Sequence, residues 1–189
     1  MIFPNDMPKF SPLKIELKNK RIVQIRQAEI SDAENLLNCI KKYVPESEYI
    51  PKLSHEIKGT INQEKEWINF FLMNKNSLLL VAEYNNQLIG NIDLTGNQRK
   101  LMEHTAVVGM GMLKEWRNTG LGTALLSNAI EWAKQNELLE VIWLQVYTEN
   151  IAGLKLYKKM GFLENGTIKN FFKHENTYFD NLTMSRSVK

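Results

Sequence analysis

The segment from Thr105 to Gly122 constrains the fold of this 189-residue chain more than any other part of it. A β-rich apolar run over Thr105–Leu113 leads into a short polar loop, and Gly120 and Gly122 then open an amphipathic helix. The first N–H groups of a helix have no intrahelical partners, and glycines let an anion come close to them. The pattern predicts a phosphate-binding turn, although ordinary turn chemistry produces the same pattern. It lacks the Gly-Lys-Ser/Thr of a Walker A loop and the glycine spacing of a dinucleotide-binding fold.

The strand before this turn carries two glycines of its own, Gly109 and Gly111. Glycine weakens a strand, so it usually marks a bulge or a place where a ligand or another backbone comes close. A bulge here would separate the strand from Val141–Tyr147, a continuous apolar run that we expect to be a strand covered on both faces. The gap would admit an extended, amide-bearing chain. A local twist of the sheet is the alternative explanation.

A second informative segment runs from Asn150 to Phe162 and predicts a helix that ends at Gly161. Asn150 stands where a helix N-cap belongs, which is a structural role. Tyr157 lies two turns further along, on an apolar stripe. Its ring suits the core, and its phenol equally suits a proton donor to a departing thiolate.

The remaining segments predict a mixed α/β sheet with a short arm before it. Ser31 and Glu34 form a capping-box pattern, with Ser31 as the N-cap, and the pair Asn85-Asn86 suits a tight hairpin turn. We expect a domain over residues 21–189 behind an N-terminal arm, residues 1–20. The expected strands are Arg21–Arg26, Leu78–Tyr84, Leu88–Leu94, Phe162–Phe172 and Thr177–Arg186, and the other expected helices are Glu64–Met73 and Gly120–Gln135.

Composition excludes several classes of protein. Hydrophobic residues make up 43% of the chain, enough for a core, and 24 Lys and Arg balance 21 Asp and Glu. The chain has no basic stripe of the kind that binds nucleic acid, and its apolar runs are far shorter than the roughly 20 residues of a membrane span. The one cysteine, Cys39, excludes an internal disulfide and a Cys-rich metal site. We therefore expect a cytoplasmic protein without a metal.

The two motifs together resemble the GNAT superfamily of acetyl-CoA-dependent N-acetyltransferases. The phosphate loop of that family, Arg/Gln-x-x-Gly-x-Gly/Ala, is matched by residues 117–122, and its next motif is matched by residues 150–162, with Gly153 in place of the usual Ala. The resemblance implies a central, mixed, mostly antiparallel twisted sheet flanked by about four helices. It also implies a splayed pair of parallel strands that holds the cofactor.

Carried over residue by residue, the resemblance implies a site for acetyl-CoA. Backbone groups of Met110 and Met112 would pair with the pantetheine arm, and Asn150 would hydrogen-bond its other side. Tyr157 would protonate or stabilise the departing thiolate. The pyrophosphate would be held by the N–H groups of Arg117, Asn118, Thr119, Gly120, Leu121 and Gly122 together with Thr123.

The group that takes the proton from the attacking amine is where this chain departs from the family pattern. Members of the family often carry a Glu on the strand before the phosphate loop, where this chain has Ala106. His104, two residues earlier, would point to the same face and suits proton transfer near neutral pH. Glu103 and Asp93 are alternatives.

The acceptor is the least legible part of the site. The segment after the helix that Ser31 is expected to open contains three residues that would attract a cationic amine, Glu46, Glu48 and Tyr49. A solvated acidic loop is the simpler explanation. Cys39 lies far from both motifs and is not needed for direct transfer.

The expected function is transfer of an acetyl group from acetyl-CoA to a primary amine of a small molecule or a peptide N-terminus, in a ternary complex. A catalytically silent acyl-CoA sensor is the alternative, and a domain in which both motifs only pack is a third reading. The resemblance also implies a possible homodimer through the C-terminal strands.

Overall fold

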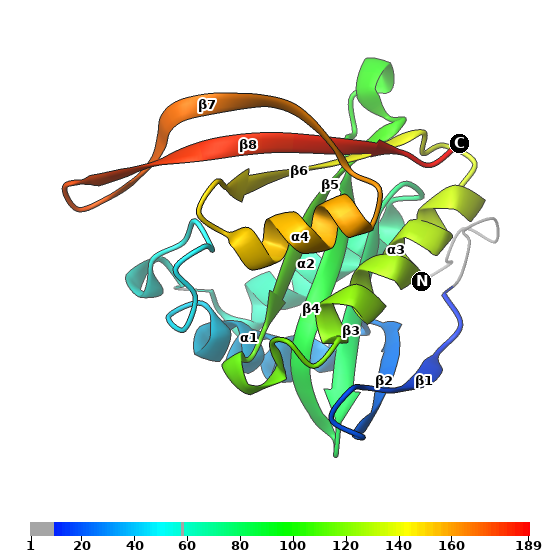
Figure 1. The fold of residues 1–189 in the computed structure, drawn as a ribbon. Coiled ribbons are helices and arrows are strands. Elements are labelled where there is room, and N and C mark those ends of the chain that lie inside the picture. The colour runs from blue at the N-terminus through cyan, green and yellow to red at the C-terminus, as the bar shows by residue number, and fades with distance from the viewer. Residues whose placement is uncertain (1–9, 58) are drawn as a thin grey trace.

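The computed structural model describes residues 10–57 and 59–189, and it contains one eight-stranded sheet (Figure 1). The strand order is β1-β2-β3-β4-β5-β6-β8-β7, and every neighbouring pair is antiparallel except β5 and β6. The mixed sheet with one parallel pair confirms the expected fold class. The strands are β1 Leu13–Glu16, β2 Ile22–Gln27, β3 Leu78–Tyr84, β4 Gln87–Gly96, β5 Thr105–Met112, β6 Val141–Tyr147, β7 Leu163–His174 and β8 Thr177–Ser187.

Four α-helices cover the two faces of the sheet. Helices α3 and α4 lie on the face toward the viewer in Figure 1, and α1 and α2 lie behind the sheet. The buried side chains form two separate clusters that match these layers, one with α3 and one with α1 and α2. The helices are α1 Ala33–Tyr43, α2 Ile61–Met73, α3 Leu121–Gln135 and α4 Ile151–Lys159.

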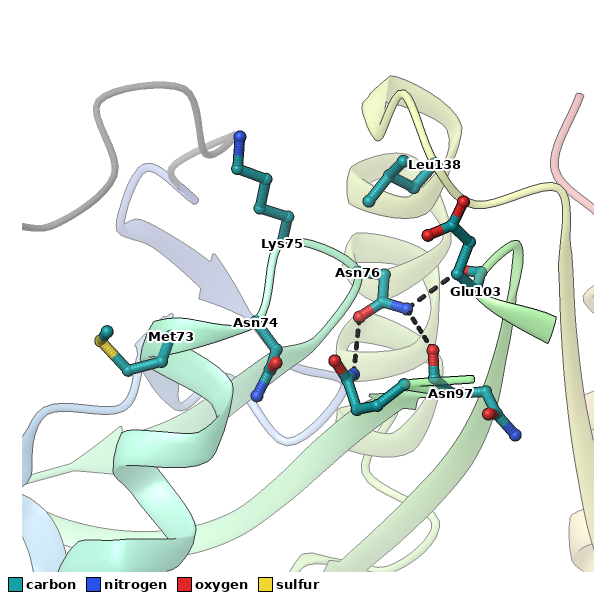
Figure 2. A pocket seen from close by; sticks show the side chains of 8 residues that line it. Met73, Asn74, Lys75, Asn76, Asn97, Glu103 and Leu138 are labelled. Carbon is teal, nitrogen blue, oxygen red and sulfur yellow. Dashed lines mark hydrogen bonds between the residues drawn. The ribbon is translucent and has the colours of Figure 1, made fainter. Parts of the chain in front are cut away.

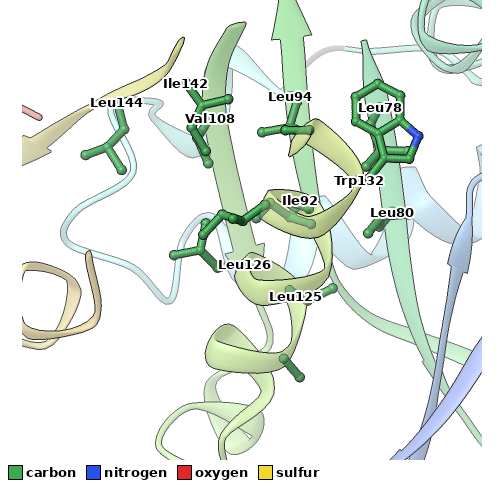
Figure 3. Packing of buried hydrophobic residues seen from close by; sticks show 14 of the residues in the cluster. Leu78, Leu80, Ile92, Leu94, Val108, Leu125, Leu126, Trp132, Ile142 and Leu144 are labelled. Atoms are coloured by element: carbon green, nitrogen blue, oxygen red, sulfur yellow. The ribbon is translucent and has the colours of Figure 1, made fainter. Parts of the chain in front are cut away.

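The central strand β3 is buried on both faces, because its side chains alternate between the two clusters. Leu78 and Leu80 join the α3 side, where they pack with Ile92, Leu125 and other apolar residues (Figure 3). The prediction that β6 is covered on both faces is wrong. Alternate residues of β6, from Ile142 on, are buried on the α3 side, and its other face is more open.

Two of the predicted local signals can be compared directly with the structure. Asn85 and Asn86 both adopt positive φ, 49° and 61°, so the hairpin turn between β3 and β4 is confirmed. The predicted N-cap at Ser31 is wrong, because Glu29 starts a short 3₁₀ turn whose capping box pairs Glu29 with Asp32. Helix α1 continues from that turn.

The sheet begins earlier in the chain than the expected domain boundary at Arg21. Leu13–Glu16 forms β1 and pairs with β2 along four positions, so part of the predicted arm over residues 1–20 is an edge strand. Residues 1–9 of that arm lie outside the described residues.

A half-buried ion-pair network joins β2, β3 and the start of α1. The Arg26 guanidinium donates to both oxygens of Asp32, at 2.6 and 2.8 Å, and to Oε2 of Glu83 at 2.8 Å. Burial raises the pKa of Asp32, but hydrogen bonds from Arg26 and from the Glu29 N–H, together with the charge on Arg26, lower the pKa by more than burial raises it, so the net shift is downward. The Arg26 pKa is raised, chiefly by the Asp32 hydrogen bond. The charge on Arg26 is therefore what makes the buried Asp32 carboxylate stable.

Replacing Arg26 with Leu is expected to lower the free energy of unfolding by about 2 to 3 kcal/mol, because it leaves Asp32 buried without its cation. The Asp32 pKa is lowered in the folded state. The stabilisation is therefore present above the unfolded-state pKa and is lost as the pH falls through the folded-state pKa. Urea unfolding at several pH values measures both effects. Lys20→Ala, which removes the exposed pair with Glu16, is the control and should change stability by less than about 0.5 kcal/mol.

Candidate functional site

The parallel strands β5 and β6 pair only over their first three residues. The paired positions run from Thr105 opposite Val141 to Val107 opposite Trp143, and beyond them the strands diverge. Strand β5 stays bonded to β4 on its other side, with partners from Ala106 to Met112. The edge of β5 that faces β6 is therefore open over its second half.

The backbone groups on this open edge follow from the ladder with β4. The N–H of Leu113 donates to the Ile89 carbonyl, and alternate residues of a strand turn their backbone groups to the same side. Gly109 and Gly111 therefore face β4, and Met110 and Met112 direct their N–H and C=O groups toward the gap. Unpaired backbone groups of a strand are a ready partner for an extended chain.

Gly109 and Gly111 do not mark a bulge, because the register between β4 and β5 runs without a shift. They make room for two side chains from elsewhere. A Cβ at Gly109 would lie 2.6 Å from Oδ1 of Asp93, and one at Gly111 would lie 2.4 Å from the ring of Tyr43. The predicted close approach is correct, but the groups that approach belong to the protein itself.

Asp93 lies on β4 directly opposite Gly109, on the side of the sheet that carries α1. Burial raises the pKa of its carboxyl to about 7, against opposing hydrogen bonds from Thr95 and from its own backbone. The Tyr43 hydroxyl is close by and donates to Oδ1 of Asn91 at 2.9 Å. A carboxyl that titrates near neutral pH thus lies one residue from Met110 on the neighbouring strand.

The first turn of α3 has unsatisfied N–H groups and no internal cap. Its N-cap is Gly120, which has a φ of 96° and no side chain, and the first turn contains no acidic residue. The carbonyl of Gly120 already accepts from Ala124, so the N–H groups of Leu121, Gly122 and Thr123 precede the first intrahelical bond. Such a helix start favours an anion.

Arg117 uses both its backbone N–H and its guanidinium in hydrogen bonds within the protein, so only part of the predicted pyrophosphate site is free. Its N–H donates to the Lys114 carbonyl at 3.1 Å, so the expectation that this N–H holds pyrophosphate does not fit the structure. Its guanidinium donates to the Glu46 carbonyl at 2.8 Å. Asn118, with a φ of 61°, and Thr119 carry the chain from there to Gly120.

The acidic loop after α1 contacts the phosphate loop, rather than only presenting carboxylates to an amine as expected. Oε2 of Glu46 accepts from the Lys114 N–H at 3.0 Å, and its carbonyl accepts from Arg117. Both Glu46 and Glu48 are exposed, but Glu46 connects this loop to the phosphate loop, whereas Glu48 has no hydrogen bond or ion pair with a described residue.

Aromatic rings line the region where β6 ends. The ring of Tyr147 stacks on Phe172 of β7, with centroids 3.8 Å apart, and Tyr49 lies 5.8 Å away at an angle. Tyr147 points to the α1 side of the sheet, because Leu144 and Val146 point to the α3 side. The sequence singled out Tyr49 but not Tyr147 or Phe172, since their meeting depends on the β7–β8 hairpin.

The two predicted residues of α4 lie where the sequence motif expects them. Asn150 is the N-cap of α4, and its Oδ1 accepts from the Gly153 N–H at 2.9 Å. Tyr157 is half-buried and packs edge-to-face on Phe162, with centroids 5.9 Å apart. Burial raises the Tyr157 pKa to about 12, which keeps the phenol protonated. Within the described residues its hydroxyl has no hydrogen-bond partner.

His104 and Glu103 lie at the other end of β5, where the strands are still paired. The His104 carbonyl accepts from the N–H groups of Glu140 and Val141, at 2.8 and 3.1 Å. His104 is six residues from Met110, on the order of 20 Å along an extended strand. The role of His104 stays a prediction, with Asp93 far closer to the open edge.

The end of the sheet near Glu103 is a small hollow lined by polar side chains (Figure 2). Asn76 closes it by donating to the carbonyls of Asn97 and Glu103, both at 2.9 Å, and the Glu103 carboxylate pairs with Lys100. The Asn76 amide and the Glu103 carboxylate are therefore engaged within the protein, and the hollow lies where loops meet.

Other candidate chemistries find little support in the described residues. Cys39 is buried on α1, and burial raises its pKa to about 12, so it remains a thiol. Among residues 10–57 and 59–189 there is no group of three or more His, Cys, Asp or Glu side chains that could hold a metal ion. No helix in that part of the chain has the length and hydrophobicity to cross a membrane.

Replacing Gly120 with Ala should lower the free energy of unfolding by about 1 kcal/mol, because alanine must adopt a positive φ there. Gly122→Ala is the matched control two residues later. There the nearest obstacle is the flexible end of Met112, 3.2 Å from the new Cβ, so stability should be unchanged or slightly higher. Urea unfolding of both ligand-free variants measures the difference, and equal losses would contradict the assigned backbone geometry.

Comparison with known proteins agrees with this geometry. The model of the Acetyltransferase (GNAT) family matches residues 42–162. L-amino acid N-acetyltransferase AaaT of Escherichia coli K12 is 31% identical over 107 residues, which cover 57% of this chain and 66% of that protein. An N-alpha-acetyltransferase of Sulfurisphaera tokodaii is 24% identical over 165 residues, covering 83% of this chain and 90% of the other.

Solved structures share most of the fold. A GNAT-family acetyltransferase from Streptococcus pneumoniae is 30% identical, with a TM-score of 0.82, and covers 87% of this chain and 99% of its own. The putative acetyltransferase yncA from Salmonella typhimurium, solved with acetyl-CoA, has a TM-score of 0.79 at 17% identity, covering 88% and 94%. The second likeness concerns the fold alone. From the family match and the close structural relative, this chain belongs to the GNAT acetyltransferase family.

Proposed function

We propose that this protein transfers an acetyl group from acetyl-CoA to a primary amine in a ternary complex. One observation carries the proposal: the open edge of β5 lies beside the uncapped first turn of α3, where a Cβ at Gly122 would be 3.2 Å from the end of the Met112 side chain. An amide-bearing arm that ends in phosphates fits this combination, since the edge pairs with amides and the helix start attracts an anion. The names of the relatives support an amine acceptor.

The residues that would hold the donor follow from this geometry. Met110 and Met112 offer their outward backbone groups to the pantetheine arm, and the N–H groups of Leu121 to Thr123 hold the pyrophosphate. The Asn150 amide nitrogen completes the site, because its oxygen already caps α4. A bound thioester supplies the acetyl group and a thiolate leaving group.

Two side chains have the protonation states that the reaction requires. Asp93 accepts the proton of the attacking amine, directly or through a water, because its carboxyl titrates near pH 7 beside the open edge. Tyr157 donates to the departing thiolate, because its phenol stays protonated and its hydroxyl has no partner among the described residues. No covalent intermediate on the protein is needed.

The aromatic wall of Tyr49, Tyr147 and Phe172 favours an acceptor that carries an apolar group next to its amine. Two of the relatives are named an L-amino acid N-acetyltransferase and an N-alpha-acetyltransferase, which supports α-amines as the class to test first. We also propose a cytoplasmic location and a homodimer. The exposed apolar residues Leu163, Ile168 and Phe171 of the edge strand β7 support the homodimer.

The direct test is a panel of amines with acetyl-CoA, read by the release of free thiol. Wild-type protein should release CoA with at least one α-amine, and Tyr157→Phe should lower kcat about 10-fold or more while its affinity for acetyl-CoA stays within about twofold. CoA binding with no turnover across the panel would instead support a silent acyl-CoA sensor. Absence of CoA binding would contradict both.

The assignment of Asp93 predicts a specific change in the pH profile. In the wild-type enzyme kcat/KM should rise as the Asp93 carboxyl loses its proton near pH 7. Asp93→Asn should lower kcat/KM by about 10²-fold or more and remove that rise, measured with the same acceptor so that the titration of the amine cancels.

His104→Gln is the matched variant for this experiment. If Asp93 is the base, His104→Gln keeps the rise near pH 7 with kcat/KM close to that of the wild type. Loss of the rise in His104→Gln, with the rise retained in Asp93→Asn, would assign the proton transfer to His104 instead.

A further inference from the structure

The turn between β1 and β2 packs against the phosphate loop. The Lys18 N–H donates to the Thr119 carbonyl at 3.0 Å, which fixes this turn beside the start of α3. The aliphatic stem of Lys18 then crosses Gly120, with Cγ and Cε 3.7 and 3.9 Å from where a Cβ of Gly120 would lie. The Lys18 ammonium is one bond beyond Cε, so it is within reach of the uncapped N-terminus of α3.

The charge on Lys18 is not neutralised by the described part of the protein. Lys20, two residues away in the same turn, pairs with Glu16 at 3.0 Å, but Lys18 forms no ion pair with any described residue. The first turn of α3 adds no carboxylate. A cation without an ion-pair partner among the described residues and a set of free N–H donors therefore lie at the same end of α3.

The cation that the loop motif itself provides is used elsewhere. The Arg117 guanidinium donates to the carbonyl of Glu46, in the loop after α1. Arg21, the next cation of the β1–β2 region, stacks over Trp116 with 5.0 Å from its Cζ to the ring centre, and so anchors this region to the residues just before the loop.

We propose that Lys18 is a donor-binding residue that contacts a phosphate group of the CoA nucleotide, so that the N-terminal hairpin helps this enzyme select full CoA thioesters over shorter pantetheine thioesters. The inference rests on the proposed function, because it takes the start of α3 as the pyrophosphate site. An ammonium on a flexible stem suits a phosphate as a point charge, and helix N–H groups supply the directional bonds. The contact lies at the surface, so salt weakens it.

The test is the dissociation constant for CoA, measured by calorimetry without turnover, in the wild type and in Lys18→Met. Methionine keeps an unbranched stem of similar length and removes the charge. The variant should bind CoA about three- to tenfold more weakly at low ionic strength, and the difference should shrink as salt is added. Lys20→Met is the control in the same turn and should bind CoA like the wild type. Ligand-free melting curves of both variants should match the wild type.

Two truncated ligands, 3′-dephospho-CoA and pantetheine, identify the phosphate. If Lys18 contacts the ribose 3′-phosphate, Lys18→Met should leave the affinity for 3′-dephospho-CoA unchanged. If Lys18 contacts the pyrophosphate, the affinities for CoA and for 3′-dephospho-CoA should fall by the same factor. Pantetheine, which has neither group, should bind equally to wild type and variant. Equal CoA affinity in wild type and Lys18→Met, or an equal loss in Lys20→Met, would overturn the inference. Failure of the wild type to bind CoA would instead overturn the proposed function.

Discussion

The parallel pairing of β5 with β6 stops after three residues, and the whole site depends on that limit. A sheet tolerates an opened edge only if the strand is held on its other side, and β4 holds β5 at seven positions. Because β4 is itself next to β3, which is buried on both faces, the opened strand is anchored to a strand of the buried core. The gap is therefore a stable feature of the fold rather than a weak point in it.

The same strand carries two glycines whose role becomes clear only in three dimensions. Because Gly109 and Gly111 have no Cβ, the Asp93 carboxyl packs directly on the backbone of Gly109 and the Tyr43 ring packs directly on that of Gly111. Burial raises the pKa of Asp93 to about 7. The missing Cβ of Gly109 leaves the space in which this buried carboxyl lies.

The sequence predicts this protein best where the signal is local. The hairpin at Asn85-Asn86, the strand β6 and the glycine-opened helix α3 all follow from short patterns, and the structure contains them. It predicts poorly what depends on distant partners: Tyr43 reaches Gly111 from another helix, and Arg117 turns to Glu46. Ser31 fails as a cap for a related reason. The reciprocal pair Glu29 and Asp32 starts the turn earlier, and Arg26 fixes Asp32 from a separate strand.

Glu46 connects two regions that would receive different substrates. It joins the loop after α1, close to the aromatic wall, to the backbone and side chain that begin the phosphate loop. The two hydrogen bonds through Glu46 therefore hold the loop after α1 and the phosphate loop in one relative position. A substitution at Glu46 would change both regions at once, although the residue lies in only one of them.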